Sequence, residues 1–480
     1  MDVLSLDATD QLKALVAREI SARELLDASV ARTDRLHARL NAVVARDLER
    51  AYAAAKAIDD RRVRGGRLGP LAGLPMTVKE AFDVEGLPAC AGVRSRLNRI
   101  AKDALVVDRA RSADAIVWGK TNTPVNSADW QTYNPVYGTT NNPWNVKCTP
   151  GGSSGGSAVA LAAGMTALEI GADMGGSLRV PASFCGVFAH RPTYGLVPQR
   201  GYVPPVDAAA DLDMAAVGPM ARSARDLQLL LSIIVASPAL SQPAPVELKD
   251  LKIALWLDEP SFTIDPEAKA VIVRFAERLA QKGAVVESIR SPAPTAAMMF
   301  AFTTLLLAVI GFEMPWLQRA FYELLRGPAK IARAFGAGPF SWAHGALGVT
   351  ARHREWLEAN ETRAKFALSV REFFTRFDVL IAPATPVVAF PHNHAPVLLR
   401  RLKCSDGRSV KYLEMLDWVG FATMFSLPAT AVPAGLTRDG LPVGLQIVGP
   451  HGRDSLTLSL AQAIEEQING FRPPPCVQAI

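Results

Sequence analysis

Two stretches rich in glycine and serine hold the side chains of this sequence that are best suited to catalysis. Residues 150–157 contain four glycines and three serines, and residues 171–177 form a second glycine-rich turn that ends at Ser177. Glycine costs backbone entropy, so such clusters are typical of places where the backbone must approach another group closely. Consecutive backbone N–H groups in the second turn can converge on an oxyanion. We therefore expect both stretches to belong to a functional site.

Two familiar uses of glycine-rich loops fit this sequence poorly. The pattern G-x-x-x-x-G-K-[ST] is absent, and neither stretch gives G-x-G-x-x-G after a strand, so phosphate binding is not indicated. Residues 151–155 formally match G-x-S-x-G, the nucleophile elbow of α/β-hydrolases. The elbow requires a strand leading into it, whereas residues 141–145 are rich in turn formers.

A lysine upstream supplies the base that a nucleophilic serine needs. Lysine accepts a proton near neutral pH only if burial lowers its pKa. Lys79 follows the apolar stretch of residues 73–78, where it would be desolvated. Taken alone, Lys79 is more typical of a surface lysine and Ser153 of a loop serine, but the surrounding motifs reverse that preference.

Several long motifs resemble those of the amidase signature family and keep that family's order along the chain. The resemblance spans roughly residues 10–225 and 370–465. The matching segments are residues 73–80 (GLPMTVKE), 119–124 (GKTNTP), 134–145, 151–157, 171–181, 218–222 (GPMAR), 433–435 and 440–446.

This resemblance implies a catalytic triad of Lys79, Ser153 and Ser177. Ser177 would attack the carbonyl carbon, and Ser153, held by a cis peptide bond after Gly152, would pass the proton to neutral Lys79. The product would be an acyl-enzyme that water then hydrolyses.

The resemblance also implies the groups around the triad. The oxyanion hole would consist of the backbone N–H groups of Met174, Gly175, Gly176 and Ser177, and the supporting side chains would be Ser154, Asp173 and Arg179. The chain departs from the family pattern at Ala172, where Thr or Ser is usual, and at residues 189–193, where the family has G-L-K-P-T. Neither departure falls on the triad, so we expect them to affect loop details.

The alternation of predicted strands, helices and glycine-rich turns indicates an α/β fold. The resemblance implies a single large domain over residues 1–480, with a central mixed, twisted β-sheet covered by helices on both faces. The signature core would occupy about 70–225, a variable substrate region about 290–370, and a C-terminal return to the sheet about 375–465. Helices are expected over the first 60 residues and at 158–163 and 265–283. The expected strands are residues 76–79, 115–119, 166–170, 252–256, 285–286, 378–383, 429–433 and 441–448.

Composition narrows the class of protein. The chain has 480 residues, of which 49% are hydrophobic and 20% charged, so disorder is excluded for most of it. Basic residues exceed acidic ones by only six, 52 against 46. The densest basic patch, residues 61–64, is expected to be a solvated loop rather than a nucleic-acid-binding surface.

We expect a protein without metal or other cofactor, and the cysteines and histidines argue against a metal site. The five cysteines include no C-x-x-C pair, which argues against a disulfide framework or a zinc site and indicates a reducing compartment. His392 and His394 alternate but lack an obvious third ligand. Because the first residues also lack the basic and apolar regions of a secretion signal, we expect a cytoplasmic location.

One uncharged segment, residues 291–312, carries much of the apolar excess. It sits at the length threshold of a membrane-spanning helix, but prolines open it and no basic cluster flanks it. We interpret it as a buried or pocket-lining helix and leave open that residues 296–312 associate with a membrane surface. Its members Met298, Met299, Phe300 and Phe302 would line an acyl pocket or belong to ordinary core.

The resemblance thus implies a hydrolase of small-molecule amides. We expect it to be a monomer or a homodimer. Aryl esters and carbamates are chemically close, because they pass through the same tetrahedral oxyanion. The apolar segment favours hydrophobic or aryl substrates. Two alternatives remain: a glutamine-hydrolysing A subunit of a tRNA amidotransferase, which would need a charged clamp and partner subunits, and a catalytically silent binding protein on the same scaffold.

Overall fold

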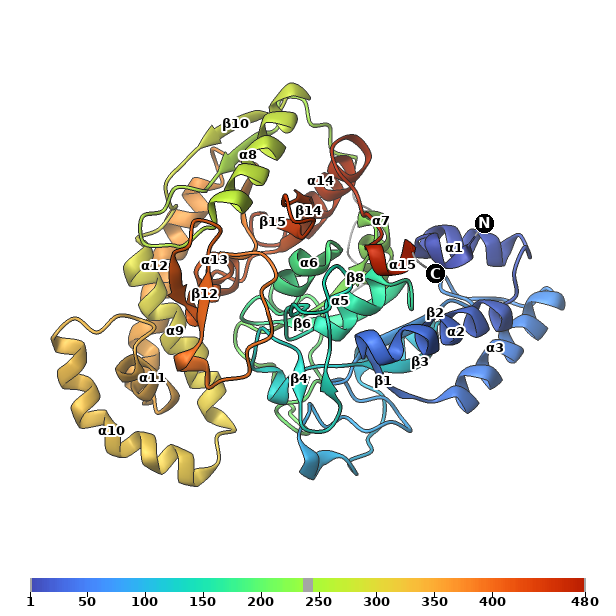
Figure 1. Cartoon of the computed structure of the whole chain (residues 1–480), viewed down its shortest axis with the longest axis horizontal. Coiled ribbons are helices and arrows are strands. Elements are labelled where there is room, and N and C mark those ends of the chain that lie inside the picture. Colours follow the sequence, from blue (N-terminus) through green and yellow to red (C-terminus); the bar gives the residue numbers. More distant parts are fainter. Residues whose placement is uncertain (1, 236–244, 479–480) are drawn as a thin grey trace.

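A mixed β-sheet runs through the centre of the molecule (Figure 1). The computed structural model describes residues 2–235 and 245–478, and these residues form a single large α/β domain with eleven strands in the main sheet. The strands lie in the order β1 (Val43–Arg46), β3 (Ile116–Thr121), β2 (Pro75–Lys79), β6 (Leu168–Asp173), β8 (Ala216–Ala221), β7 (Phe188–Arg191), β14 (Ala429–Leu436), β15 (Pro442–Val448), β11 (Val379–Pro383), β9 (Lys252–Leu255) and β10 (Val285–Ser288).

Parallel pairs occupy the two flanks of this sheet and antiparallel pairs its middle. Strands β3, β2 and β6 are parallel to one another, as are β11, β9 and β10. The strands from β6 through β8, β7, β14 and β15 to β11 pair antiparallel, and β1 is antiparallel to β3. The predicted mixed sheet is confirmed, including the hairpin of β14 and β15 and the parallel unit of β9 and β10.

The bounds of one predicted strand need correction, and three strands of the main sheet (β1, β7 and β8) were not predicted. The sequence pattern predicts a strand over residues 166–170 and a turn from Gly171, but β6 runs from Leu168 to Asp173 because it pairs with β8 along its whole length. Strand β1 was not predicted, since its four residues lie between two helices and it owes its strand conformation to pairing with β3 at the sheet edge.

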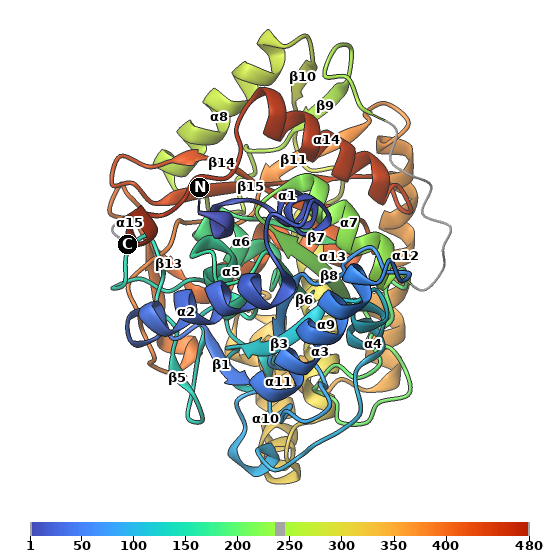
Figure 2. The ribbon, with the colours of Figure 1, turned by 90° about the vertical axis from the view of Figure 1, so that its right-hand side faces the viewer.

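Helices cover both faces of the sheet (Figure 2). Gln446 of β15 hydrogen-bonds Arg179 of α6 (Arg179–Cys185) and the backbone of Trp418 in α13 (Asp417–Met424), so these two helices lie on one face. The neighbouring strand β14 turns Thr430 to the opposite face, where its hydroxyl group contacts Thr457 of α14 (Asp454–Gln467). Helix α7 (Ala224–Ile234) packs against α14 on that second face.

The helix bounds follow local signals at several ends. Ser21 and Glu24 form the predicted capping box of α2, and Asp265 caps α8 with Pro266 at its first position. The helices are α1 (Ala8–Val16), α2 (Ala22–Leu40), α3 (Leu48–Val63), α4 (Leu105–Ser112), α5 (Gly155–Ala162), α6 (Arg179–Cys185), α7 (Ala224–Ile234), α8 (Pro266–Gln281), α9 (Thr295–Phe312), α10 (Trp316–Ala334), α11 (Trp342–Val349), α12 (His353–Phe373), α13 (Asp417–Met424), α14 (Asp454–Gln467) and α15 (Pro475–Gln478).

The basic patch at residues 61–64 lies at a helix end rather than in a loop. Helix α3 continues to Val63, and Arg61 and Arg62 belong to its last turn. Cations are favourable there because the last turn exposes unpaired carbonyl groups and the negative end of the helix dipole. The loop prediction for these residues was therefore wrong by about one helical turn.

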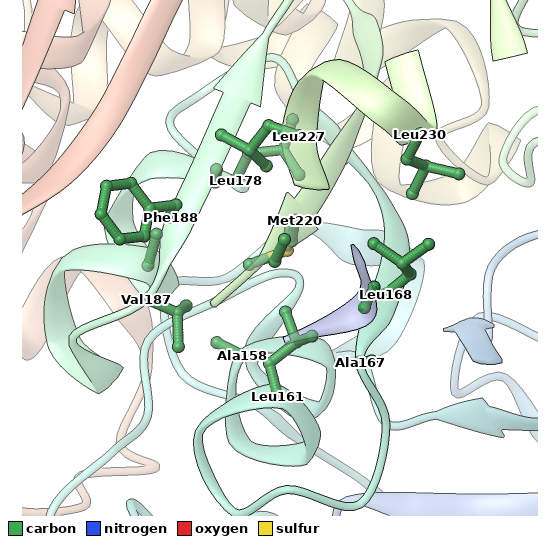
Figure 3. Packing of buried hydrophobic residues seen from close by; sticks show 14 of the residues in the cluster. Ala158, Leu161, Ala167, Leu168, Leu178, Val187, Phe188, Met220, Leu227 and Leu230 are labelled. Atoms are coloured by element: carbon green, nitrogen blue, oxygen red, sulfur yellow. The ribbon is translucent and has the colours of Figure 1, made fainter. Parts of the chain in front are cut away.

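Part of the main core lies where α5 meets the sheet (Figure 3). Ala158 and Leu161 of α5 belong to one buried cluster with Leu168 of β6, Phe188 of β7 and Met220 of β8. Small residues let this helix approach the strands closely, and it begins at Gly155, three residues earlier than its alanine run suggests. The glycine-serine loop is thereby held against the centre of the sheet.

Candidate active site

Lysine and serine candidates meet at one edge of the sheet because β2 and β6 are parallel neighbours. Thr77 and Val78 of β2 pair with Glu169 and Ile170 of β6. The C-terminal ends of parallel strands lie at the same edge, so Lys79 at the end of β2 comes beside the turn that follows β6. This register explains how residues about a hundred positions apart form one site.

Lys79 is buried and contacts the first candidate serine directly. Its Nζ donates a hydrogen bond to Ser153 Oγ at 2.7 Å and another to the Tyr202 hydroxyl group at 3.3 Å. Burial lowers the pKa of Lys79 to about 7, although the charge of Asp173 acts in the opposite direction. A lysine with this pKa is substantially neutral at physiological pH and is able to accept a proton.

The backbone around Ser153 matches what the resemblance implies. The peptide bond between Gly152 and Ser153 is cis. The Thr123 hydroxyl group donates to the carbonyl oxygen of Ser153 at 2.9 Å. A Cβ atom on Gly152 would lie 2.4 Å from the carbonyl oxygen of Asp129, so only glycine fits at this position.

Ser177 lies in the turn between β6 and α6, next to the Ser153 loop. The amide of Ser154 donates to the carbonyl oxygen of Ser177 at 3.2 Å, which joins the two loops. Ser153 is buried, whereas Ser177 is partly exposed. Ser177 is thus the most solvent-accessible of the three candidate side chains.

A buried ion pair holds the turn that carries Ser177. The Asp173 carboxylate accepts hydrogen bonds from the Arg179 guanidinium at 2.8 and 3.0 Å and from the amide of Leu178 at 3.1 Å. Burial alone would raise the pKa of Asp173, but the charge and hydrogen bonds of Arg179 lower it to about 2. Arg179 also donates to the carbonyl oxygen of Val419 and to Gln446, so the turn is tied to α13 and β15.

Two of the expected surrounding groups have other roles in the structure. The amide of Gly176 donates to Asp173 Oδ1 at 3.0 Å and thus helps to close the turn. The Ser154 hydroxyl group is buried without a hydrogen-bond partner among the described residues, so Ser154 connects the loops through its backbone rather than its side chain.

Apolar side chains border the backbone between Asp173 and Ser177. A Cβ atom on Gly175 would contact Leu416 at 3.4 Å and Trp130 at 3.9 Å. The Trp130 indole donates to the carbonyl oxygen of Gly175 at 2.7 Å, which fixes the ring beside the turn. Leu416 and Trp130 therefore form an apolar wall beside Gly175.

The apolar segment of residues 291–312 packs against Leu416, one of the two residues of this wall. Helix α9 buries Met298, Met299 and Phe302 in a cluster that includes Leu416 and against which Trp130 and Met174 pack. These α9 side chains are core, whereas Phe300 is half-buried and contacts His344 of α11. Of the two alternatives for Met298, Met299 and Phe302, the structure favours core.

Tyr202 and Arg191 are among the contacts in the site that sequence reasoning missed, as are Trp130 and Leu416. Tyr202 bonds Lys79 but lies in a stretch without any motif. Arg191 lies 3.7 Å from Asp173 and donates to the carbonyl oxygen of Met214. Arg191 lies within residues 189–193, where the chain departs from the family pattern. That departure was the one sequence feature that pointed to this segment.

The cysteines and histidines considered as metal ligands do not form a metal site in the described residues. All five cysteines are buried thiols. His394 stacks on Tyr133, with ring centroids 3.8 Å apart. Within residues 2–235 and 245–478, no group of three His, Cys, Asp or Glu side chains is arranged to hold a metal ion.

Comparisons with known proteins agree with the family resemblance. A family model described as Amidase matches residues 24–458. The A subunit of the glutamyl-tRNA(Gln) amidotransferase from Moorella thermoacetica is 32% identical, with 99% of each chain covered. The acylamidase of Rhodococcus erythropolis is 31% identical and covers 96% of this chain and 95% of its own. The solved structure of 6-aminohexanoate cyclic dimer hydrolase with substrate superposes with a TM-score of 0.79 at 26% identity, covering 99% of both chains.

The burial of Lys79 predicts a pH-dependent stability difference. Between a pH of about 7 and 10.5 the unfolded chain binds a proton at Lys79 that the folded chain does not. Lys79 therefore lowers the free energy of unfolding increasingly as the pH falls from 10.5, and the loss is complete below a pH of about 7. We expect the Lys79→Met variant to gain in Tm relative to the parent chain. The gain should be largest below a pH of about 7 and should shrink toward a pH of about 10.

Thermal unfolding followed by circular dichroism across this pH range measures the effect. Lys56→Met, which removes an exposed lysine of α3, is the matched control and should show no such trend. A difference in Tm between the Lys79 variant and the parent that stays constant with pH would contradict the lowered pKa.

Proposed function

Given that the chain belongs to the amidase signature family, we propose that it hydrolyses amides with an apolar acyl or aryl group through an acyl-enzyme on Ser177. The observation that carries this proposal is the hydrogen bond of 2.7 Å between Lys79 Nζ and Ser153 Oγ, made by a buried lysine whose pKa is about 7. A silent binding protein would have no need of a desolvated lysine, because burying an amine lowers stability.

In the proposed reaction, Ser177 Oγ attacks the carbonyl carbon of the amide. Ser153 takes the proton of Ser177 and passes its own proton to neutral Lys79, which the contact between Lys79 and Ser153 supports. The proton then returns through Ser153 to the nitrogen of the leaving amine, and the C–N bond breaks. A water molecule activated by the same relay releases the acid from Ser177.

Backbone amides in the turn after β6 would stabilise the tetrahedral oxyanion. We assign this role to the N–H groups of Met174, Gly175 and Ser177, since the Gly176 amide already donates to Asp173. Asp173 and Arg179 position these groups, and Tyr202 positions Lys79. Preorganised donors of this kind typically contribute about 3–4 kcal/mol each to transition-state stabilisation.

The apolar wall supports the choice of substrate class. Leu416 and Trp130 lie beside Gly175, so an aliphatic or aromatic group next to the scissile carbonyl gains contacts there. Aryl esters and carbamates share the tetrahedral oxyanion and fall within the same proposal.

Glutamine hydrolysis for a tRNA amidotransferase is the second candidate function. A glutamyl-tRNA(Gln) amidotransferase A subunit is 32% identical over nearly the whole chain. The acylamidase at 31% identity shows that overall similarity does not separate the two. Recognition of free glutamine requires partners for its charged ammonium and carboxylate groups. The neighbouring ion pair of Arg400 and Asp129 is engaged by Tyr133 and Tyr412, which favours the apolar substrate.

A fluorophosphonate probe tests the nucleophile. We expect peptide mass spectrometry to find the label on Ser177, and the labelling rate to rise with pH and reach half its maximum near a pH of about 7, where Lys79 becomes neutral. Lys79→Ala should lower the labelling rate by about two orders of magnitude or more. Ser232→Ala, at an exposed serine of α7, is the control and should label normally.

A label on Ser153 or any other residue would overturn the assignment of the nucleophile. Labelling of the Lys79→Ala variant at the parental rate would instead remove Lys79 as the base while leaving Ser177 in place.

A hydrolysis panel tests the substrate class. We expect kcat/KM for an acyl anilide to exceed that for glutamine or acetamide. Leu416→Asn should lower kcat/KM about tenfold for the anilide and much less for acetamide, because only the larger acyl group contacts the wall. Leu357→Asn, at an exposed position of α12, serves as the matched control. Efficient glutamine hydrolysis that appears only when amidotransferase partner subunits are added would support the second candidate.

A further inference from the structure

Helix α10 presents a continuous apolar face to solvent. The exposed fractions range from 58% to 88% for Leu317, Phe321, Leu324 and Ile331 of the helix and for Phe335, the C-cap residue that follows it. Trp316 at the start of the helix is also exposed. Large apolar side chains are individually common on protein surfaces, but a contiguous patch usually marks a contact with another phase or molecule.

The spacing of these residues gathers them into one band. At about 100° per residue, the exposed apolar positions of α10 fall within an arc of roughly 140°. The exposed Ala320, Gly327, Pro328 and Ala334 lie in the same arc and add no charge. A different face of the helix, which includes Tyr322, Leu325 and Ala329, packs against α11. The band is therefore not needed to hold α10 on the protein.

Two cations, Arg319 and Lys330, border the apolar band at the edge formed by Trp316. Arg319 and Lys330 are exposed and form no ion pair with any described residue, and they flank the edge of the arc at Trp316. The acidic Glu323 between them lies 3.8 Å from the buried Arg326, which also binds Glu355. The polar edge of the helix thus carries a net positive charge available to an external partner.

The position of α10 leaves the band accessible. Both views of the ribbon place α10 at the rim of the molecule, with α11 beside it (Figures 1 and 2). Helix α9 differs in this respect: it is the one helix of residues 2–235 and 245–478 long and apolar enough to span a membrane, yet 44% of it is buried, and it packs against α11, α12 and α13. Inserting α9 into a bilayer would require breaking these contacts, whereas α10 needs no rearrangement.

We propose that α10 binds the surface of an anionic lipid bilayer, lying in the interface plane with its apolar band in the acyl region. Amphipathic helices with bulky apolar side chains on one face and cations on the other bind such surfaces through buried apolar area and attraction to anionic headgroups. A second copy of the chain fits the charges less well, because antiparallel two-fold pairing of the band would place both sets of Arg319 and Lys330 along the same edge.

Vesicle flotation of the full chain tests this proposal. The protein should float with vesicles of phosphatidylcholine and phosphatidylglycerol in equal parts, and less with phosphatidylcholine alone. Replacing three residues of the band together (Leu317→Gln, Leu324→Gln and Phe335→Gln) should lower the ratio of bound to free protein about a hundredfold. The matched control, Val16→Gln with Val63→Gln, alters two exposed apolar residues on α1 and α3 at the far side of the molecule and should bind like the parent.

A charge variant provides an independent readout. Arg319→Gln with Lys330→Gln removes no core contact and should lower binding to the anionic vesicles about thirtyfold while leaving binding to phosphatidylcholine unchanged. Absence of flotation by the parent chain would overturn the proposal, as would flotation of the band variant at the parental level. Sedimentation equilibrium that shows a dimer dissociated by the band variant, without flotation, would assign the face to a second copy and overturn it as well.

Discussion

The buried ion pair of Asp173 and Arg179 is the interaction on which the rest of the site depends. Asp173 ends β6 and closes the following turn through its own carboxylate, while Arg179 begins α6 and reaches α13 and β15. Breaking such a pair leaves an uncompensated charge in the core, which typically destabilises a protein by about 3–5 kcal/mol. This ion pair therefore ties the turn that carries Ser177 to α13 and β15, in addition to the strand pairing that joins the sheet.

The same region contains a group that opposes stability. Lys79 is desolvated at the end of β2, and the pKa that makes it a base is also the reason it destabilises the fold. The surrounding core offsets this effect: α5 packs its small residues closely on the sheet, and glycine at position 152 lets the Ser153 loop approach the backbone of Asp129. The close packing around Lys79 thus both stabilises the fold and removes water from the amine, which lowers its pKa.

Helices α9 to α12 connect the inner site with the outer surface. Helix α9 supports the apolar wall of Leu416 and Trp130, and α11 lies between it and α10. One uncharged stretch of sequence is therefore buried for packing, and the helix that follows it exposes an apolar band. The apolar excess in composition thus reflects both the buried core around α9 and the exposed apolar band of α10.

Local sequence alone determined the family, the α/β class and the positions of the glycine-rich loops, because turn formers, capping residues and long ordered motifs act over short stretches. It also predicted that Lys79, Ser153 and Ser177 would lie together, through the resemblance rather than through any local rule. Tertiary structure decided what depends on distant partners. Strand β1 forms only beside β3, β6 extends as far as β8 pairs with it, and Tyr202 and Arg191 reach the site by folding of the chain. The exposure of α10 likewise follows from which neighbours the fold places against it, since an apolar side chain carries the same sequence signal whether it is buried or faces solvent.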